Sequence, residues 1–306
     1  RIIDQEVTPI RLNWRRNLPL YLMFVPVIAF FVIFKYVPMG GAVIAFKKYN
    51  LMDGILHSPW VGFDNFRLLF STPTTIQIIR NTLMLSLMSI VIGFPFPILL
   101  AILLSEVRRM WFKRAVQTLV YLPHFFSWII VSGMIVTIFS QQSGIVSGLW
   151  ESITGHAYPF LYREGSWLAI FVGSGIWKEA GFSAIIYLAA LTNIDPTLYE
   201  AASIDGASKW KQIRHVTLPG LQMTIVLMLI LSMGRVMEVG FDQIYMLQNS
   251  TVSDVSEVIS TYIYKVGLMG SQFSLTAAFG LFESLVAFTL VLTANAIARR
   301  FGNGLW

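Results

Sequence analysis

The residue types that most often carry out chemistry are few in this chain, and they are scattered. Cysteine is absent from the 306 residues, and no two of the four histidines have the spacing of metal ligands. Neither a G-x-x-x-x-G-K-[ST] nucleotide-binding loop nor a G-x-S-x-G nucleophile elbow occurs. We therefore expect no enzymatic activity, no cofactor and no metal site.

Charged residues inside apolar stretches indicate a different chemistry. A charge at the centre of a bilayer costs about 2.5–3.5 kcal/mol on insertion scales, so such side chains are expected to face protein or water. The sequence leaves two interpretations open, a polar substrate pathway and structural pairing between helices. The residues concerned are Lys178, Glu179, Arg235, Glu238 and Glu283.

The spacing of these charges makes different pairings expected. Arg235 and Glu238 are three residues apart on an expected helix, so they could neutralise each other. Lys178 and Glu179 are adjacent and point about 100° apart on a helix, so we expect each to find its partner on another helix.

The composition identifies the elements that must position these residues. Apolar and aromatic residues make up 56% of the chain and charged residues only 12%, against about 25% charged in soluble domains. This excludes a disordered chain, a disulfide scaffold and most soluble enzymes. The net charge of +6 is more typical of cytoplasmic Lys and Arg in a membrane protein than of a nucleic-acid partner.

Six apolar runs are long enough to cross a bilayer, which needs about 20 residues per helix. We expect an all-α polytopic membrane protein with six transmembrane helices in a single domain, residues 1–306. Prolines at positions 26, 95, 97 and 123 are expected to kink or break their helices. The expected spans are Leu18–Phe34, Thr82–Leu104, Leu119–Phe139, Trp167–Leu191, Leu221–Phe241 and Leu275–Ala298.

Basic residues predict the orientation. With a cytoplasmic N-terminus, thirteen Lys and Arg fall on the cytoplasmic side and seven on the outer side, which favours both termini in the cytoplasm. The cytoplasmic set is Arg1, Arg11, Arg15, Arg16, Arg108, Arg109, Lys113, Arg114, Lys209, Lys211, Arg214, Arg299 and Arg300. The outer set is Lys35, Lys47, Lys48, Arg67, Arg80, Arg163 and Lys265.

The segment between the fourth and fifth spans, residues 195–220, is too polar to cross a membrane and carries its own helix signals. Asp195 and Pro196 predict an N-cap and first helical residue, and Gly206 predicts a stop. Ser208 is expected to cap a second helix, and Pro219 to limit its continuation into the fifth span. The alternative is an amphipathic hairpin lying on the lipid.

The residues of this segment resemble the E-A-A…G…I-L-P loop of ABC importer permeases. The matching positions are Glu200, Ala201, Ala202, Gly206, Ile213, Leu218 and Pro219. The stretches Trp60–Phe66 and Phe241–Tyr245 are similar to segments of sugar-importer permeases. Together they resemble the branch of the maltose-type family that takes up oligosaccharides and polysaccharide fragments, which includes the alginate importer.

The resemblance implies a type I ABC importer permease in the bacterial inner membrane. Its hairpin would fit a cleft in cytoplasmic ATPase subunits, expected in two copies, with Ala201, Ala202 and Gly206 in close contact and Glu200 facing a basic residue. The other implied partners are a second permease, expected to be a different chain, a solute-binding protein and an oligosaccharide. An acidic cargo such as alginate would give Arg235 a carboxylate to bind.

A rival hypothesis is an ion- or proton-coupled secondary transporter or channel using Glu179, Glu238 and Glu283. A secondary transporter does not need the E-A-A hairpin, and the sequence shows no sign of inverted repeats. We therefore favour the importer permease.

Overall fold

The computed structural model describes residues 14–300, and in this range the chain is helical, with a single isolated bridge between Lys47 and Trp60. The α-helices are α1 (Trp14–Phe31), α2 (Val37–Met39), α3 (Gly54–His57), α4 (Asp64–Ser71), α5 (Pro73–Met88), α6 (Pro95–Glu106), α7 (Met110–Tyr121), α8 (Trp128–Phe139), α9 (Ile145–Thr154), α10 (Glu164–Leu191), α11 (Pro196–Ile204), α12 (Lys209–Gln212), α13 (Leu218–Gly234), α14 (Phe241–Leu247), α15 (Ser253–Ser256), α16 (Ile259–Tyr262) and α17 (Phe273–Arg300). Shorter 3-10 and π turns connect several of them.

Five helical stretches of residues 14–300 are long and apolar enough to span a membrane. They are Asn17–Phe46, Pro73–Glu106, Glu164–Leu191, Lys209–Gly234 and Phe273–Arg300. The expected third span is instead a bent pair, Met110–Phe125 and Trp128–Phe139, at 102° to each other. The sequence placed a break here at Pro123, which lies in the 3-10 turn just before the bend. With the bent pair as one span, the count is six.

The helices continue through Pro26, Pro95 and Pro97, so three of the four prolines expected to kink or break a span do not break it. A proline lacks an N–H, and its ring clashes with the carbonyl four residues earlier. In three places that carbonyl lies in a π turn, whose wider backbone accommodates the ring and lets the helix continue. Val32–Tyr36 precedes Pro38, Ser89–Gly93 precedes Pro95, and Ile213–Thr217 precedes Pro219.

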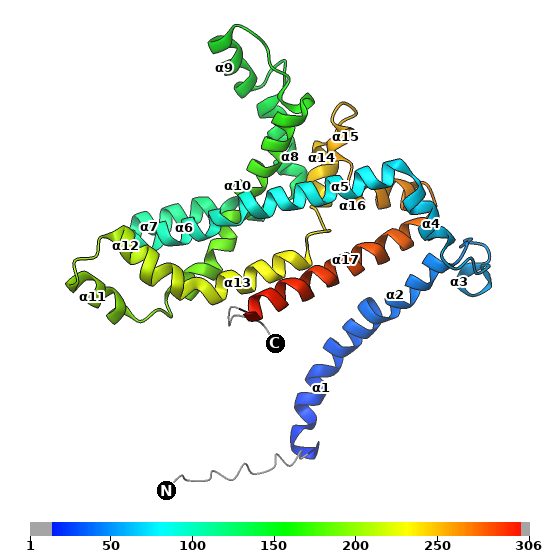
Figure 1. The fold of residues 1–306 in the computed structure, drawn as a ribbon, viewed down its shortest axis with the longest axis horizontal. Helices are drawn as coiled ribbons and strands as arrows, with labels where there is room; N and C mark the ends of the chain where they lie inside the picture. Colours follow the sequence, from blue (N-terminus) through cyan, green and yellow to red (C-terminus); the bar gives the residue numbers. More distant parts are fainter. Residues whose placement is uncertain (1–13, 301–306) are drawn as a thin grey trace.

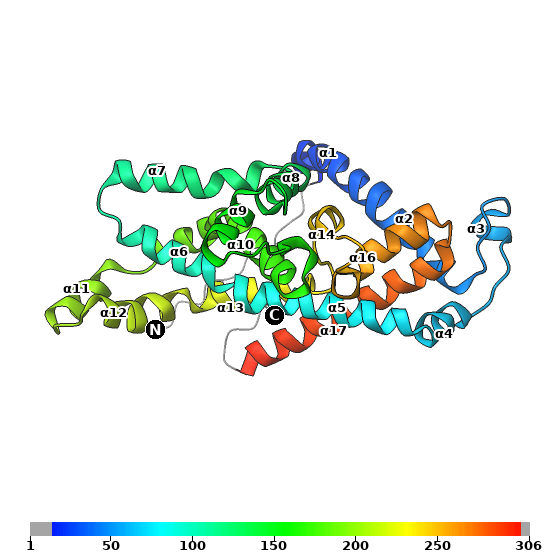
Figure 2. The ribbon, with the colours of Figure 1, turned by 90° about the horizontal axis from the view of Figure 1, so that it is seen from above.

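Figure 1 shows how the ends of the elements are distributed. The hairpin of α11 and α12 lies at the left of the view, the start of α1 at the bottom and the end of α17 near the centre, while α9 and α15 lie at the top and α3 at the right. Figure 2 shows that the α6–α7 junction also lies at the hairpin end. Arg1 and Arg11 of the basic set lie outside the described residues.

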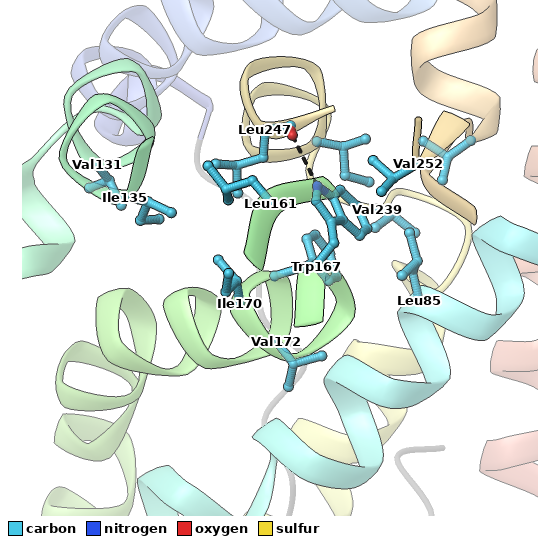
Figure 3. Packing of buried hydrophobic residues seen from close by; sticks show 13 residues of the cluster. Leu85, Val131, Ile135, Leu161, Trp167, Ile170, Val172, Val239, Leu247 and Val252 are labelled. Carbon is cyan, nitrogen blue, oxygen red and sulfur yellow. Dashed lines mark hydrogen bonds between the residues drawn. The ribbon is translucent and has the colours of Figure 1, made fainter. Parts of the chain in front are cut away.

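The main apolar cluster holds α10 against the segments that follow α13. Trp167 is fully buried and its indole N–H donates to the carbonyl of Leu247 over 2.9 Å, as Figure 3 shows. Its ring stacks on Phe171 of the same helix. In contrast, no residue of 17–31 in α1 is buried, which is typical of a helix surrounded by other apolar groups in a membrane.

Candidate functional site: coupling hairpin and polar pathway

The first helix of the hairpin, α11, begins and ends where the sequence predicts. The backbone N–H of Thr197 donates to the Asp195 carboxylate over 2.9 Å, with Pro196 as the first helical residue. These bonds lower the pKa of the Asp195 carboxyl, because they stabilise its charged form. Gly206, at φ +72°, adopts the left-handed conformation that ends a helix, and the Ala207 N–H donates to the Ala202 carbonyl.

The second helix of the hairpin differs from the expectation in two ways. It begins at Lys209, but no side-chain hydrogen bond from Ser208 caps it. It also runs through Pro219 into the fifth span without a break, because the π turn Ile213–Thr217 replaces the bond that proline cannot make. There the Leu218 N–H donates to the carbonyl of Ile213, five residues earlier. The second helix of the hairpin and the fifth span therefore form one continuous helical stretch, Lys209–Gly234.

Side-chain contacts brace the hairpin from inside. The buried amide of Gln212 donates to the Ser203 hydroxyl over 3.0 Å, which joins the two helices. The hydroxyls of Tyr199 and Thr217 are 3.0 Å apart. These contacts join α11 to α12 and to the π turn that leads into α13.

One part of the hairpin surface carries a single exposed charge, Glu200, beside small residues. Glu200 is exposed and forms no ion pair with any residue in 14–300. Ala201 and Gly206 are exposed and Ala202 is half-buried, so small side chains surround the charge. Ile213 lies in the π turn and Leu218 and Pro219 at the start of α13, on the element that returns to the span.

Lys178 and Glu179 of α10 pair with each other, and each also contacts His124 outside this helix, so the expectation that their partners lie on other segments holds only in part. The Lys178 ammonium lies 2.8 Å from the Glu179 carboxylate, because its four-carbon stem bends around the helix. Lys178 is buried and also donates to the His124 carbonyl, while His124 Nδ1 lies 2.7 Å from Glu179. The His124 ring stacks on Phe182 at 3.9 Å. The cluster clamps the chain at the 102° bend.

The sequence analysis placed Arg235 and Glu238 on one helix, but in the structure they do not share a helix. The helix α13 ends at Gly234, and Arg235 and Glu238 form a turn in which the Glu238 N–H donates to the Arg235 carbonyl. No ion pair joins their side chains, and Arg235 has none with any other described residue. The guanidinium therefore has no carboxylate partner in the part of the chain that the structure describes.

Glu179, Arg235, Glu238 and Glu283 line three cavities that share lining residues. The first, about 310 Å³, is lined by Glu179, Trp128 and Tyr187. The second, about 220 Å³, is lined by Arg235 and Glu238 and shares its Ser89, Ile90, Ser232 and Gln243 walls with the first. The third, about 430 Å³, shares Glu238, Val239 and Gly240 with the second and is also lined by Glu283. We call this series of cavities the polar pathway.

Lys178 is not part of the polar pathway, because it is buried behind Glu179 and lines none of these cavities. Sequence reasoning missed His124, Trp128 and Gln243. Their contacts are between segments far apart in the chain, such as the Gln243 amide and the Phe171 carbonyl at 2.7 Å. No periodic pattern reports such contacts. The described residues contain no group of His, Asp and Glu that could hold a metal.

Known proteins with this sequence and fold are transport permeases. A family model described as binding-protein-dependent transport system inner membrane component matches residues 93–305. The polygalacturonan/rhamnogalacturonan transport system permease protein YteP of Bacillus subtilis (strain 168) is 46% identical over 283 residues, which is 92% of this chain and 88% of YteP. The protein LplB of the same strain is 41% identical over 287 residues, covering 94% and 90%.

Solved structures give the same result. A bacterial ABC transporter involved in the import of the acidic polysaccharide alginate contains a chain with a TM-score of 0.87 and 43% identity, covering 94% of this chain and 97% of that one. A complex of the alginate transporter with an alginate pentasaccharide-bound periplasmic protein gives a TM-score of 0.88 and 42% identity, covering 95% and 97%.

These matches decide between the two hypotheses that the sequence left open, because they extend over the hairpin and the spans alike. Permeases of this family are not catalytic, and ATP hydrolysis belongs to a separate subunit that works with a pair of permeases. The secondary-transporter alternative is thereby set aside. The chain belongs to the family of binding-protein-dependent transport system inner membrane components, and it is a permease subunit of a sugar ABC importer.

Proposed function

We propose that this permease imports acidic oligosaccharides, and that the polar pathway is the route of the cargo. The observation that carries the proposal is Arg235, a guanidinium that lines the second cavity and has no carboxylate partner among residues 14–300. A guanidinium binds a carboxylate through two parallel hydrogen bonds, and its charge is kept at every physiological pH. The carboxylates of a uronate oligomer would fit it.

The other groups of the polar pathway suit the rest of a sugar chain. Glu179, Ser232 and Gln243 supply acceptors and donors for hydroxyl groups, and the half-buried Trp128 supplies aromatic surface for sugar rings. The similarity to YteP and to the alginate importer supports a uronate cargo, since their names refer to polygalacturonan and to alginate.

The hairpin is proposed to couple this pathway to ATP. Two cytoplasmic ATPase subunits would bind the exposed face at Glu200, Ala201, Ala202 and Gly206, and Ile213, Leu218 and Pro219 would carry the motion to the fifth span. The chain would then lie in the bacterial inner membrane as a single domain, with both termini in the cytoplasm. A second permease, expected to be a different chain, would complete the pathway, and a solute-binding protein would deliver the cargo.

The test compares Arg235→Gln with wild type for uptake of acidic and neutral oligosaccharides of equal length. A selective loss of acidic uptake, by about tenfold for one charge-assisted contact, is the expected result. The matched control is Arg67→Gln, whose guanidinium lies on an exposed helix and pairs with Asp64. Equal losses for both sugars, or failure of the complex to assemble, would make Arg235 a structural residue.

A further inference from the structure

A second cavity suited to a sugar lies outside the polar pathway. It has a volume of about 720 Å³ and is formed by the end of α8, the turn that follows, α9 and the 3-10 turn Phe160–Tyr162. It shares no lining residue with the three cavities of the polar pathway. Along the chain, α9 comes before the spanning helix α10 and the hairpin of α11 and α12 comes after it; Figure 1 shows α9 at the top of the view and the hairpin at the left. We call this cavity the outer cup.

Free polar groups line the outer cup. The side chains of Gln141, Gln142 and Glu151 are exposed in it and form no hydrogen bond or ion pair with any residue in 14–300. Each amide offers two donors and an acceptor, and the carboxylate accepts only. The rim adds the phenol of Tyr162. Hydroxyl and carboxylate groups of a sugar chain would satisfy this set, and the volume falls in the range of ligand sites, about 300–1,000 Å³.

The walls of the outer cup are held in place before any ligand arrives. The Ser147 hydroxyl donates to the Phe139 carbonyl over 3.2 Å, which ties α9 to α8. The Trp150 ring packs on Phe160 with centroids 5.7 Å apart. Gly144 makes the sharp turn between them, since a Cβ there would lie 2.5 Å from the Ser140 carbonyl oxygen. A preformed site loses little entropy on binding.

We propose that the outer cup is a second oligosaccharide subsite, which holds the trailing end of a long chain while its leading end occupies the polar pathway. The inference rests on the proposed function. The two sites share no wall, so the proposal places the two ends of a long oligosaccharide in different sites, whereas a disaccharide would occupy the polar pathway alone. Binding at two linked sites raises the affinity for long chains without any change in the affinity of either site.

The test is the KM for uptake of a uronate disaccharide and of a uronate hexasaccharide by the complete importer. The variant Gln141→Ala/Gln142→Ala is expected to raise the KM for the hexasaccharide about five- to tenfold, from the loss of one or two hydrogen bonds, and to leave the disaccharide unchanged. Ser152→Ala, in the neighbouring helix α9 but not among the residues that line the cup, is the control. Co-purification of the ATPase shows that each variant assembles.

Two results would overturn the proposal. An equal rise of KM at both lengths would assign the cup to docking of the solute-binding protein, and no change at either length would leave it without a role in transport. If wild type imports neutral but not acidic oligosaccharides, the proposed cargo is wrong. In that case, the KM values for a neutral disaccharide and a neutral hexasaccharide test the role of the cup independently of the charge of the cargo.

Discussion

The ammonium of Lys209 lies 2.9 Å from the carboxylate of Glu106. Lys209 is the first residue of α12 and Glu106 the last of α6, so the ion pair joins the hairpin to a second span besides the one it continues into. Both side chains are partly exposed, at 63% and 42%. The pair is therefore a weak link, worth about 0.2–1 kcal/mol, at a place where the position of the hairpin matters.

Charge reversal at this pair is expected to reduce coupling. Glu106→Lys or Lys209→Glu places like charges side by side, and we expect uptake per ATP hydrolysed to fall about two- to fivefold. The exchanged pair Glu106→Lys/Lys209→Glu is expected to recover most of this loss, which uptake and ATPase assays on one preparation would show. Additive losses in the double variant would mean that the two residues act separately.

Reversal of the free charge on the hairpin tests ATPase docking. Glu200→Lys leaves α11 helical and its neighbours unchanged, so we expect the spans to insert normally and the ATPase to co-purify poorly. Gly206→Trp adds bulk to the same face, but it also strains a backbone with φ +72°. Glu164→Lys, an exposed acid in the first turn of α10, is the matched control. Normal ATPase recruitment and transport in both hairpin variants would refute the assignment.

A small residue on α10 allows the closest helix contact. A Cβ at Gly181 would lie 1.9 Å from the backbone carbonyl oxygen of Val120 in α7, so Gly181→Ala forces the helices apart. We expect a loss of about 1–3 kcal/mol and a clear drop in the Tm of the purified complex. Gly173→Ala on the same helix meets nothing within 4 Å and is expected to leave Tm unchanged. Equal Tm values for both variants would contradict this packing.

The cap of α11 predicts how the hairpin responds to acid. The pKa of Asp195 is lowered in the folded hairpin by its bonds to Thr197, so the cap stabilises α11 above the unfolded pKa. This contribution is lost as the pH falls through the lowered pKa. Amide-exchange protection of residues 197–203 is expected to fall over that acidic range in wild type. Asp195→Ala should show the lower protection already at neutral pH, and a wild-type-like profile in that variant would exclude the cap.

The sequence predicted the spans and the hairpin well, because both depend on local signals. Runs of apolar residues, the Asp195–Pro196 start and the Gly206 stop each determine structure within a few neighbouring residues. The effect of each proline on its helix was harder to predict. Helices continue through Pro38, Pro95 and Pro219, each of which follows a π turn, whereas Pro123 lies just before the 102° bend. Whether a proline bends a span depends on the neighbouring helices, which a single segment does not encode.

The polar pathway was only partly predictable. Glu179, Arg235 and Glu238 could be identified from the sequence because they are charged residues within or near apolar runs, and a charge in the bilayer is costly unless it faces protein or water. Their pairing could not be read from spacing, because the Lys178 stem reaches around its helix and α13 ends before Arg235. His124 and Gln243 come from other segments and meet the pathway only in three dimensions.

ATP-driven uptake tests the central claim most directly. Proteoliposomes that contain the complete importer, with the solute-binding protein added, would be supplied with a labelled uronate oligosaccharide and either internal ATP or an imposed proton or sodium gradient. The account predicts uptake with ATP and none with either gradient alone. Uptake driven by a gradient in the absence of ATP would contradict it.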